Sequence, residues 1–137
     1  MSPFFVIAIG LLAVAGCSSA KPIDDKLARA AKLADYKGDV ARGEKAFAAC
    51  RTCHSLAPGV NMAGPSLHGV VGRPAGQVPG YHYSPANRAS HVVWREERLF
   101  TYLRDPRAEL PGTFMSFGGI ADPQARADLV AYLKTLR

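Results

Sequence analysis

The sequence has few cysteines, no dense basic cluster and no apolar run long enough to span a bilayer comfortably. Cysteine occurs three times, at Cys17, Cys50 and Cys53, and the histidines outside Cys50–His54 lack the paired spacing of zinc ligands. The formal net charge is +6, but the basic residues are scattered with no run of five or more, which excludes a typical nucleic-acid-binding protein. The apolar run from Phe4 to Ala15 is shorter than a membrane-spanning helix. The excess of basic over acidic residues instead favours binding to acidic partners or anionic membranes.

The stretch Cys50-Arg51-Thr52-Cys53-His54 predicts a covalent attachment site for c-type haem. Each thiol can add to one haem vinyl group, and the adjacent imidazole reaches the iron from the same face. A thioredoxin-like redox pair is the alternative, but no strand-rich run precedes Cys50. The motif leaves the second axial ligand open. That ligand decides between an electron carrier and a protein that binds small molecules.

Length and composition indicate one small domain. The chain has 137 residues, of which 48% are hydrophobic and 20% charged, as is ordinary for a soluble fold. A domain of about 100 residues has a limited core, and a buried porphyrin would supply a large apolar nucleus.

The amino terminus resembles a bacterial lipoprotein signal. Residues 1–16 form the signal peptide, and Val14-Ala15-Gly16-Cys17-Ser18-Ser19 is similar to a lipobox. In that family a peptidase cuts before the cysteine, so Cys17 would carry acyl chains and hold the protein on the bilayer. Residues 1–16 lack the usual Lys or Arg, so an uncleaved anchor and a chance cysteine after an ordinary signal peptide stay open. The resemblance implies the periplasmic side of a bacterial membrane.

Residues 17–37 read as a lipid-anchored tether, with an extra helix packed on the domain as the alternative. Gly38-Asp39 marks the boundary, and Asp39 is placed to cap a following helix. The folded domain is therefore predicted to span residues 38–137.

The domain is predicted to be all-α, with three main helices and long loops wrapped around one haem. The helices run from Val40 to about Cys50, from about Arg95 to Arg104, and from Gln124 to Leu136. A glycine in the first helix, Gly43, predicts close contact with another element, with the last helix as a natural partner. Residues 55–93 are rich in glycine and proline, and a loop of that length needs the cofactor as its core. Polar and aromatic residues there can bond the haem propionates: Arg73, Tyr81, Tyr83, Asn87 and Trp94.

From Gly38 to Leu136 the sequence resembles a class I cytochrome c of the mitochondrial or alphaproteobacterial type. Many separated motifs carry the resemblance: Gly64-Pro65-Ser66-Leu67-His68-Gly69, Gly72-Arg73, Gly76-Gln77-Val78-Pro79-Gly80-Tyr81, Tyr83-Ser84-Pro85-Ala86-Asn87, Tyr102-Leu103, Pro111-Gly112-Thr113-Phe114-Met115 and Arg126-Ala127-Asp128-Leu129-Val130-Ala131-Tyr132-Leu133.

The resemblance implies a role for each motif residue. Met115 would bind the iron opposite His54, and the Pro65 carbonyl would accept from the free ring nitrogen of that histidine. Tyr102 would bond near the Met115 sulfur, and Phe117 would shield the haem edge. The propionate and internal-water network would comprise Arg73, Tyr83, Asn87, Trp94 and Thr113, and the crossing of the first and last helices would comprise Gly43, Phe47, Leu129 and Tyr132. With haem c bound by Cys50 and Cys53 and both axial positions filled, the implied activity is one-electron transfer, not enzymatic catalysis.

The chain departs from the family in the lysines around the haem edge. Phe114, Ala49 and Ala108 stand at three such positions, while Arg107 keeps a positive charge. An apolar Phe114 suggests a hydrophobic docking face. We expect a monomer whose partner is a membrane redox complex, such as a cytochrome bc complex or a haem–copper oxidase.

Two other functions stay open at this point. A dedicated haem subunit of one dehydrogenase would carry the same motifs. A peroxidase or gas sensor would need an open iron position, which requires that Met115 does not bind.

Overall fold

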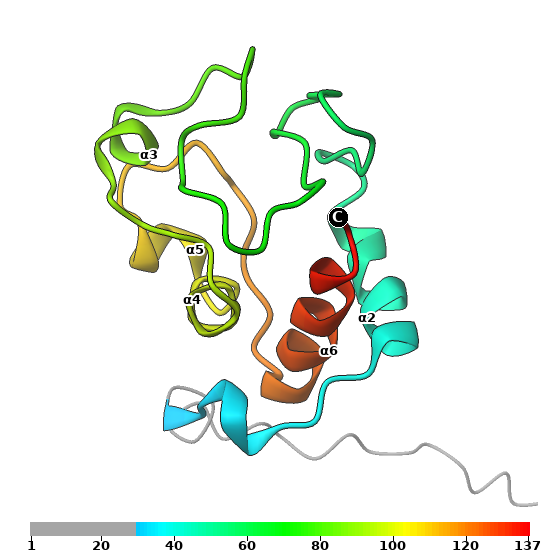
Figure 1. Ribbon diagram of the computed structural model, residues 1–137. Coiled ribbons are helices and arrows are strands. Elements are labelled where there is room, and N and C mark those ends of the chain that lie inside the picture. Colours follow the sequence, from blue (N-terminus) through cyan, green and yellow to red (C-terminus); the bar gives the residue numbers. More distant parts are fainter. Residues whose placement is uncertain (1–29) are drawn as a thin grey trace, which may run out of the picture.

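The computed structural model describes residues 30–137, which form a helical domain with long loops (Figure 1). Its elements are η1 (Leu33–Asp35), α2 (Val40–Ala46), η2 (Phe47–Ala49), α3 (Pro85–Ala89), α4 (Glu96–Tyr102), α5 (Pro106–Glu109) and α6 (Pro123–Lys134). Within these residues the extended pairing is an isolated bridge between Pro74 and Val93. The predicted all-α class is confirmed. No helix in the described part of the chain is both long and apolar enough to cross a membrane.

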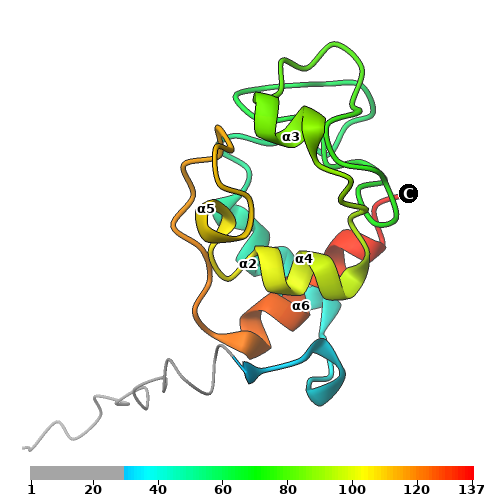
Figure 2. The ribbon, with the colours of Figure 1, turned by 90° about the vertical axis from the view of Figure 1, so that its left-hand side faces the viewer.

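The crossing of α2 and α6 organises the lower half of the molecule (Figures 1 and 2). Asp39 caps α2 by accepting from the Arg42 N–H, and Asp122 caps α6 directly before Pro123. A Cβ on Gly43 would overlap the backbone carbonyl of Asp128 and lie 2.7 Å from the Tyr132 Cβ. The close contact predicted for Gly43 is therefore present, and only glycine allows the helices to approach so closely.

The core lies where α2, α4 and α6 meet. Phe47 and Leu129 are fully buried, and the Phe47 and Tyr132 rings lie 5.6 Å apart in a tilted arrangement. The predicted first helix extends through η2, where tighter 3₁₀ turns lead into Cys50.

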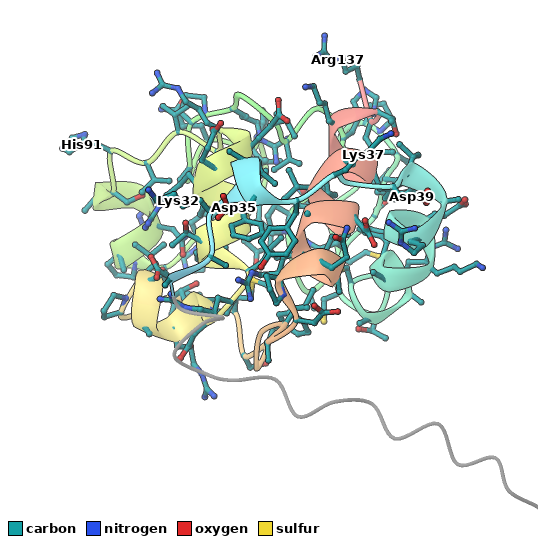
Figure 3. The ribbon with its side chains drawn as sticks, turned by 90° about the horizontal axis from the view of Figure 1, so that it is seen from below. Lys32, Asp35, Lys37, Asp39, His91 and Arg137 are labelled. Atoms are coloured by element: carbon teal, nitrogen blue, oxygen red, sulfur yellow. The ribbon has the colours of Figure 1, made fainter. Side chains whose placement is uncertain are left out.

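Residues 30–37 differ from the predicted tether. Ala31, Leu33 and Tyr36 pack against the core, and the Tyr36 ring lies 6.0 Å from that of Phe100 in α4. Seen from below, the segment crosses the underside of the domain from Lys32 to Asp39 (Figure 3). The packed unit thus begins before Gly38, because this segment has apolar side chains that gain by burial. Residues 1–29, including the signal peptide, Cys17 and most of the tether, lie outside the described residues.

Two short helices depart from the predicted element list. Ser84 caps α3 and Asp105 caps α5, each with proline as the first helical residue. The helix predicted from about Arg95 to Arg104 is α4, which ends at Tyr102, and Asp105-Pro106 then starts α5 instead of a loop. A polar cap followed by proline is a local start signal, but helices this short carry little apolar periodicity.

Candidate functional site

Cys50, Cys53 and His54 lie in one tight turn directly after η2. The His54 N–H donates to the Cys50 carbonyl at 2.9 Å, and the Cys53 N–H donates to the same oxygen at 3.1 Å. Neither Cys50 nor Cys53 forms a disulfide. Burial, together with the neighbouring Cys53, raises the pKa of the Cys50 thiol to about 11, so this cysteine is held as a neutral thiol. Within residues 30–137, no group of three or more His, Cys, Asp or Glu side chains is arranged to hold a metal ion.

His54 is held by the loop that follows it. Its Nδ1 lies 2.7 Å from the Pro65 carbonyl oxygen, and the Gly64 N–H donates to the Cys53 carbonyl at 2.7 Å. A Cβ on Gly64 would lie 2.6 Å from the His54 Nδ1, so this loop can approach the ring only with glycine there. Burial lowers the pKa of His54, while the Pro65 carbonyl acts in the opposite direction. The neutral ring, with Nδ1–H donating to Pro65, leaves Nε2 as the metal-binding nitrogen.

Met115 is fixed from two directions by the loop after α5 and by α4. The Tyr102 hydroxyl lies 3.5 Å from the Met115 Sδ, and the Met115 N–H donates to the Thr113 Oγ1 at 3.3 Å. Thr113 in turn donates to the Asn87 Oδ1 at 3.2 Å, and the Ser84 hydroxyl donates to the same oxygen at 2.8 Å. A chain of hydrogen bonds therefore connects α3 to the backbone of Met115. Ligation of iron by His54 and Met115 stays a prediction.

Arg73 directs its guanidinium into the domain. It donates to the Ser66 and His68 carbonyls, each at 2.8 Å, while its buried Nε has no hydrogen-bond partner. Burial lowers the Arg73 pKa, and the nearby Tyr83 opposes that shift. The Tyr83 hydroxyl accepts from the Val78 N–H at 3.4 Å, and burial raises its pKa. The buried Nε–H of this cationic side chain lacks a partner and so suits an anionic group such as a haem propionate.

Trp94 and Phe117 occupy different surroundings. Trp94 is buried, its ring centroid lies 4.6 Å from that of Tyr102, and its backbone N–H donates to the Arg73 carbonyl at 2.9 Å. Phe117 is half-buried in the loop after Met115. Trp94 therefore connects the Arg73 loop to α4, and the shielding role expected for Phe117 stays a prediction.

Two supporting residues, Ser84 and Asn61, have no role predicted from the sequence. Ser84 is 1% exposed and orients Asn87, while Asn61 bridges two loops by accepting from the Ser66 N–H and donating to the Pro79 carbonyl, each at 3.0 Å. The Ser84-Pro85 pair is a recognisable cap signal. Nothing local to Asn61 predicts its contact with Pro79, which lies 18 positions further along the chain.

These features define a haem protein with a covalent attachment turn and a helical frame, and the comparisons agree. The chain belongs to the cytochrome c family: the family described as Cytochrome c matches residues 40–137. It is 48% identical over 101 residues to cytochrome c of Euglena viridis, covering 73% of this chain and 99% of the relative. It is 47% identical over 97 residues to cytochrome c2 of Blastochloris viridis, covering 70% of this chain and 76% of the relative. Among solved structures it is similar to cytochrome cH from Methylobacterium extorquens, with 47% identity, a TM-score of 0.68, and coverage of 72% and 99% of the two chains.

Family membership establishes the cofactor and the general activity. The chain binds haem c covalently, and Cys50 and Cys53 are the cysteines present for it. The described residues fit that group, since they offer two thiols in one turn, a neutral imidazole and the partnerless Arg73 Nε. When bound, the haem iron supplies reversible one-electron chemistry. The protein is an electron carrier and not an enzyme.

Proposed function

We propose that the protein is a lipid-anchored electron carrier on the periplasmic side of a bacterial membrane, using a haem held between His54 and Met115. It would pass electrons between respiratory complexes, such as a cytochrome bc complex and a haem–copper oxidase, or accept them from a dehydrogenase. Cys17 would carry the acyl chains, with residues 18–29 joining the bilayer to the packed domain.

The observation that carries the proposal is the support around the two candidate axial ligands. The Pro65 carbonyl orients His54, and the Tyr102 hydroxyl donates toward the Met115 sulfur. Both side chains are held in place by these contacts, so little structural reorganisation should accompany electron transfer. A Met/His pair also favours a raised reduction potential and occupies the position that a peroxidase or gas sensor would need open.

The first test compares the optical spectra of oxidised, haem-loaded wild type, Met115→Ala and Met62→Ala. We expect the weak red band of a methionine–ferric bond in wild type and its loss in Met115→Ala. Met62 is 49% exposed and serves as the matched control, whose variant should keep the band. Absence of the band from wild type, with ready binding of carbon monoxide to the reduced protein, would refute the carrier mechanism.

The second test concerns the anchor. Mass spectrometry of the membrane-bound wild type should show a chain that begins at Cys17 and carries acyl chains, and Cys17→Ser should lack that added mass. Ser18→Ala serves as the control and should keep the added mass. A wild-type chain that still carries residues 1–16 would argue for an uncleaved anchor.

A further inference from the structure

The segments that carry the predicted axial ligands contain almost no charged side chains. From Thr52 to Asn87 the chain has one Lys, Arg, Asp or Glu residue, Arg73, and from Leu110 to Ala121 it has none. Arg73 is committed to the Ser66 and His68 carbonyls. The net charge of +6 is therefore carried by other parts of the chain.

Exposed apolar side chains lie in the same segments. Val60 and Met62, in the loop between His54 and Pro65, are 48% and 49% exposed. Phe114, directly before Met115, is 61% exposed. Each candidate ligand thus has a large apolar side chain near it in sequence that is open to solvent.

Contacts between the loops hold the segments that carry these side chains next to one another. The Asn61 amide donates to the Pro79 carbonyl at 3.0 Å, and the Tyr81 hydroxyl donates to the Ala63 carbonyl at 2.7 Å. On the other side, the His82 and Phe114 rings stack with centroids 6.3 Å apart. We call residues 57–64, 79–83 and 112–118 the apolar rim. With histidine neutral, the rim carries no formal charge.

The described chain begins at the other end of the molecule. Residues 30–36 cross the underside of the domain, whereas the loops of the rim lie at the top in Figure 1 (Figures 1 and 3).

We propose that the apolar rim is the docking surface for an electron-transfer protein whose own contact surface is apolar and uncharged. This proposal rests on the electron-carrier function proposed above and adds the chemistry of the partner. If a partner placed charged groups on the rim, those groups would lose water and meet no opposite charge, which costs binding free energy. Burial of Phe114, Val60 and Met62 would instead supply the favourable contact.

The first experiment measures where electrons leave the reduced holoprotein, with hexacyanoferrate(III) as the one-electron oxidant. Phe114→Lys and Ala41→Lys each add one positive charge, the first on the rim and the second on an exposed residue in the first turn of α2, outside the rim. A positive charge beside the exit site attracts the anionic oxidant, so at low salt we expect Phe114→Lys to react ~5-fold faster than wild type. Ala41→Lys should change the rate less than ~1.5-fold. Equal acceleration by the two variants would overturn the proposal.

The second experiment uses a purified bacterial haem–copper oxidase as the protein acceptor. The turnover per substrate concentration, kcat/KM, should change less than ~3-fold between about 20 and about 200 mM salt, because an uncharged contact gains little from steering. Phe114→Ser should lower kcat/KM by ~10-fold, in the range of a buried interface anchor. A steep loss of rate with salt, insensitivity to Phe114→Ser, or no oxidase turnover by intact holoprotein would each overturn the partner chemistry.

Two further outcomes separate this proposal from its alternatives. Sedimentation that shows a dimer of wild type, dissociated by Phe114→Ser, would assign the rim to a second copy of the chain and overturn the proposal. The red methionine–ferric band is recorded for every variant. Loss of the band in wild type refutes the proposed function, whereas an intact band with unchanged Phe114→Ser kinetics refutes the docking surface alone.

Discussion

Gly43→Ala tests whether the close approach of α2 and α6 holds the attachment turn in place. The added Cβ would overlap the Asp128 carbonyl oxygen and lie 2.6 Å from the Asp128 carbonyl carbon. An ordinary contact is near 3.4 Å or more, so the helices must separate by about 1 Å. Because η2 and Cys50 follow α2 directly, that displacement would also reach the haem-attachment turn.

The expected loss can be worked from opposing effects. Overpacking costs about 1–3 kcal/mol, and a gap of about 1 Å forfeits up to about half the dispersion energy of the contacts it opens. Those contacts include the fully buried Phe47 and Leu129. Alanine offsets about 1 kcal/mol through its higher helix propensity. We expect a net loss of about 1–2 kcal/mol, which for a domain of this size lowers Tm by roughly 4–16 °C.

The assay is guanidinium and thermal unfolding of the haem-loaded protein, with Gly118→Ala as the matched control. A Cβ on Gly118 meets no heavy atom within 4 Å, so this control should keep the stability of wild type. If Gly43→Ala unfolds within about 0.5 kcal/mol of wild type, the reasoning about the helix crossing is wrong.

Further predictions concern three other contacts. Asp128 accepts from Arg42 at 2.7 Å, a bond that lowers its pKa, so Asp128→Asn should cost about 1–3 kcal/mol at neutral pH. This stabilisation is fully present above the pKa of Asp128 in the unfolded chain, near 4, and is lost as the pH falls through its lower pKa in the folded protein. The free energies of unfolding of wild type and variant should therefore converge in acid. A difference between them that stays constant with pH would contradict this prediction. Tyr36→Ala should cost about 1–2 kcal/mol in urea unfolding through lost packing on α4, and an unchanged midpoint would show that residues 30–37 only rest on the domain. Gly64→Ala would push against His54, so it should weaken the red band and lower Tm; a wild-type spectrum and Tm would disprove the tight fit.

Structural features that depend on residues close together in the chain could be predicted from the sequence. The attachment turn follows from the spacing of Cys50, Cys53 and His54, and α6 follows from Asp122-Pro123 and a helical apolar pattern. The short helices α3 and α5 were missed because helices of this length give little periodicity. The packing of Tyr36 on Phe100 was also missed, because the few apolar residues of this segment fit either a free tether or a segment packed on the domain.

By itself the sequence determined the covalent haem chemistry, the all-α class and the positions of the main helices, because each depends on residues close together in the chain. Only the tertiary structure decided which groups meet across long separations. It brings Pro65 to the ring of His54, Tyr102 to the sulfur of Met115, and the Phe114 loop to His82. It also brings the charge-poor loops into contact with one another. Such contacts depend on how the loops close over the helical frame, and loop closure is set by packing and hydrogen bonds that no local pattern records.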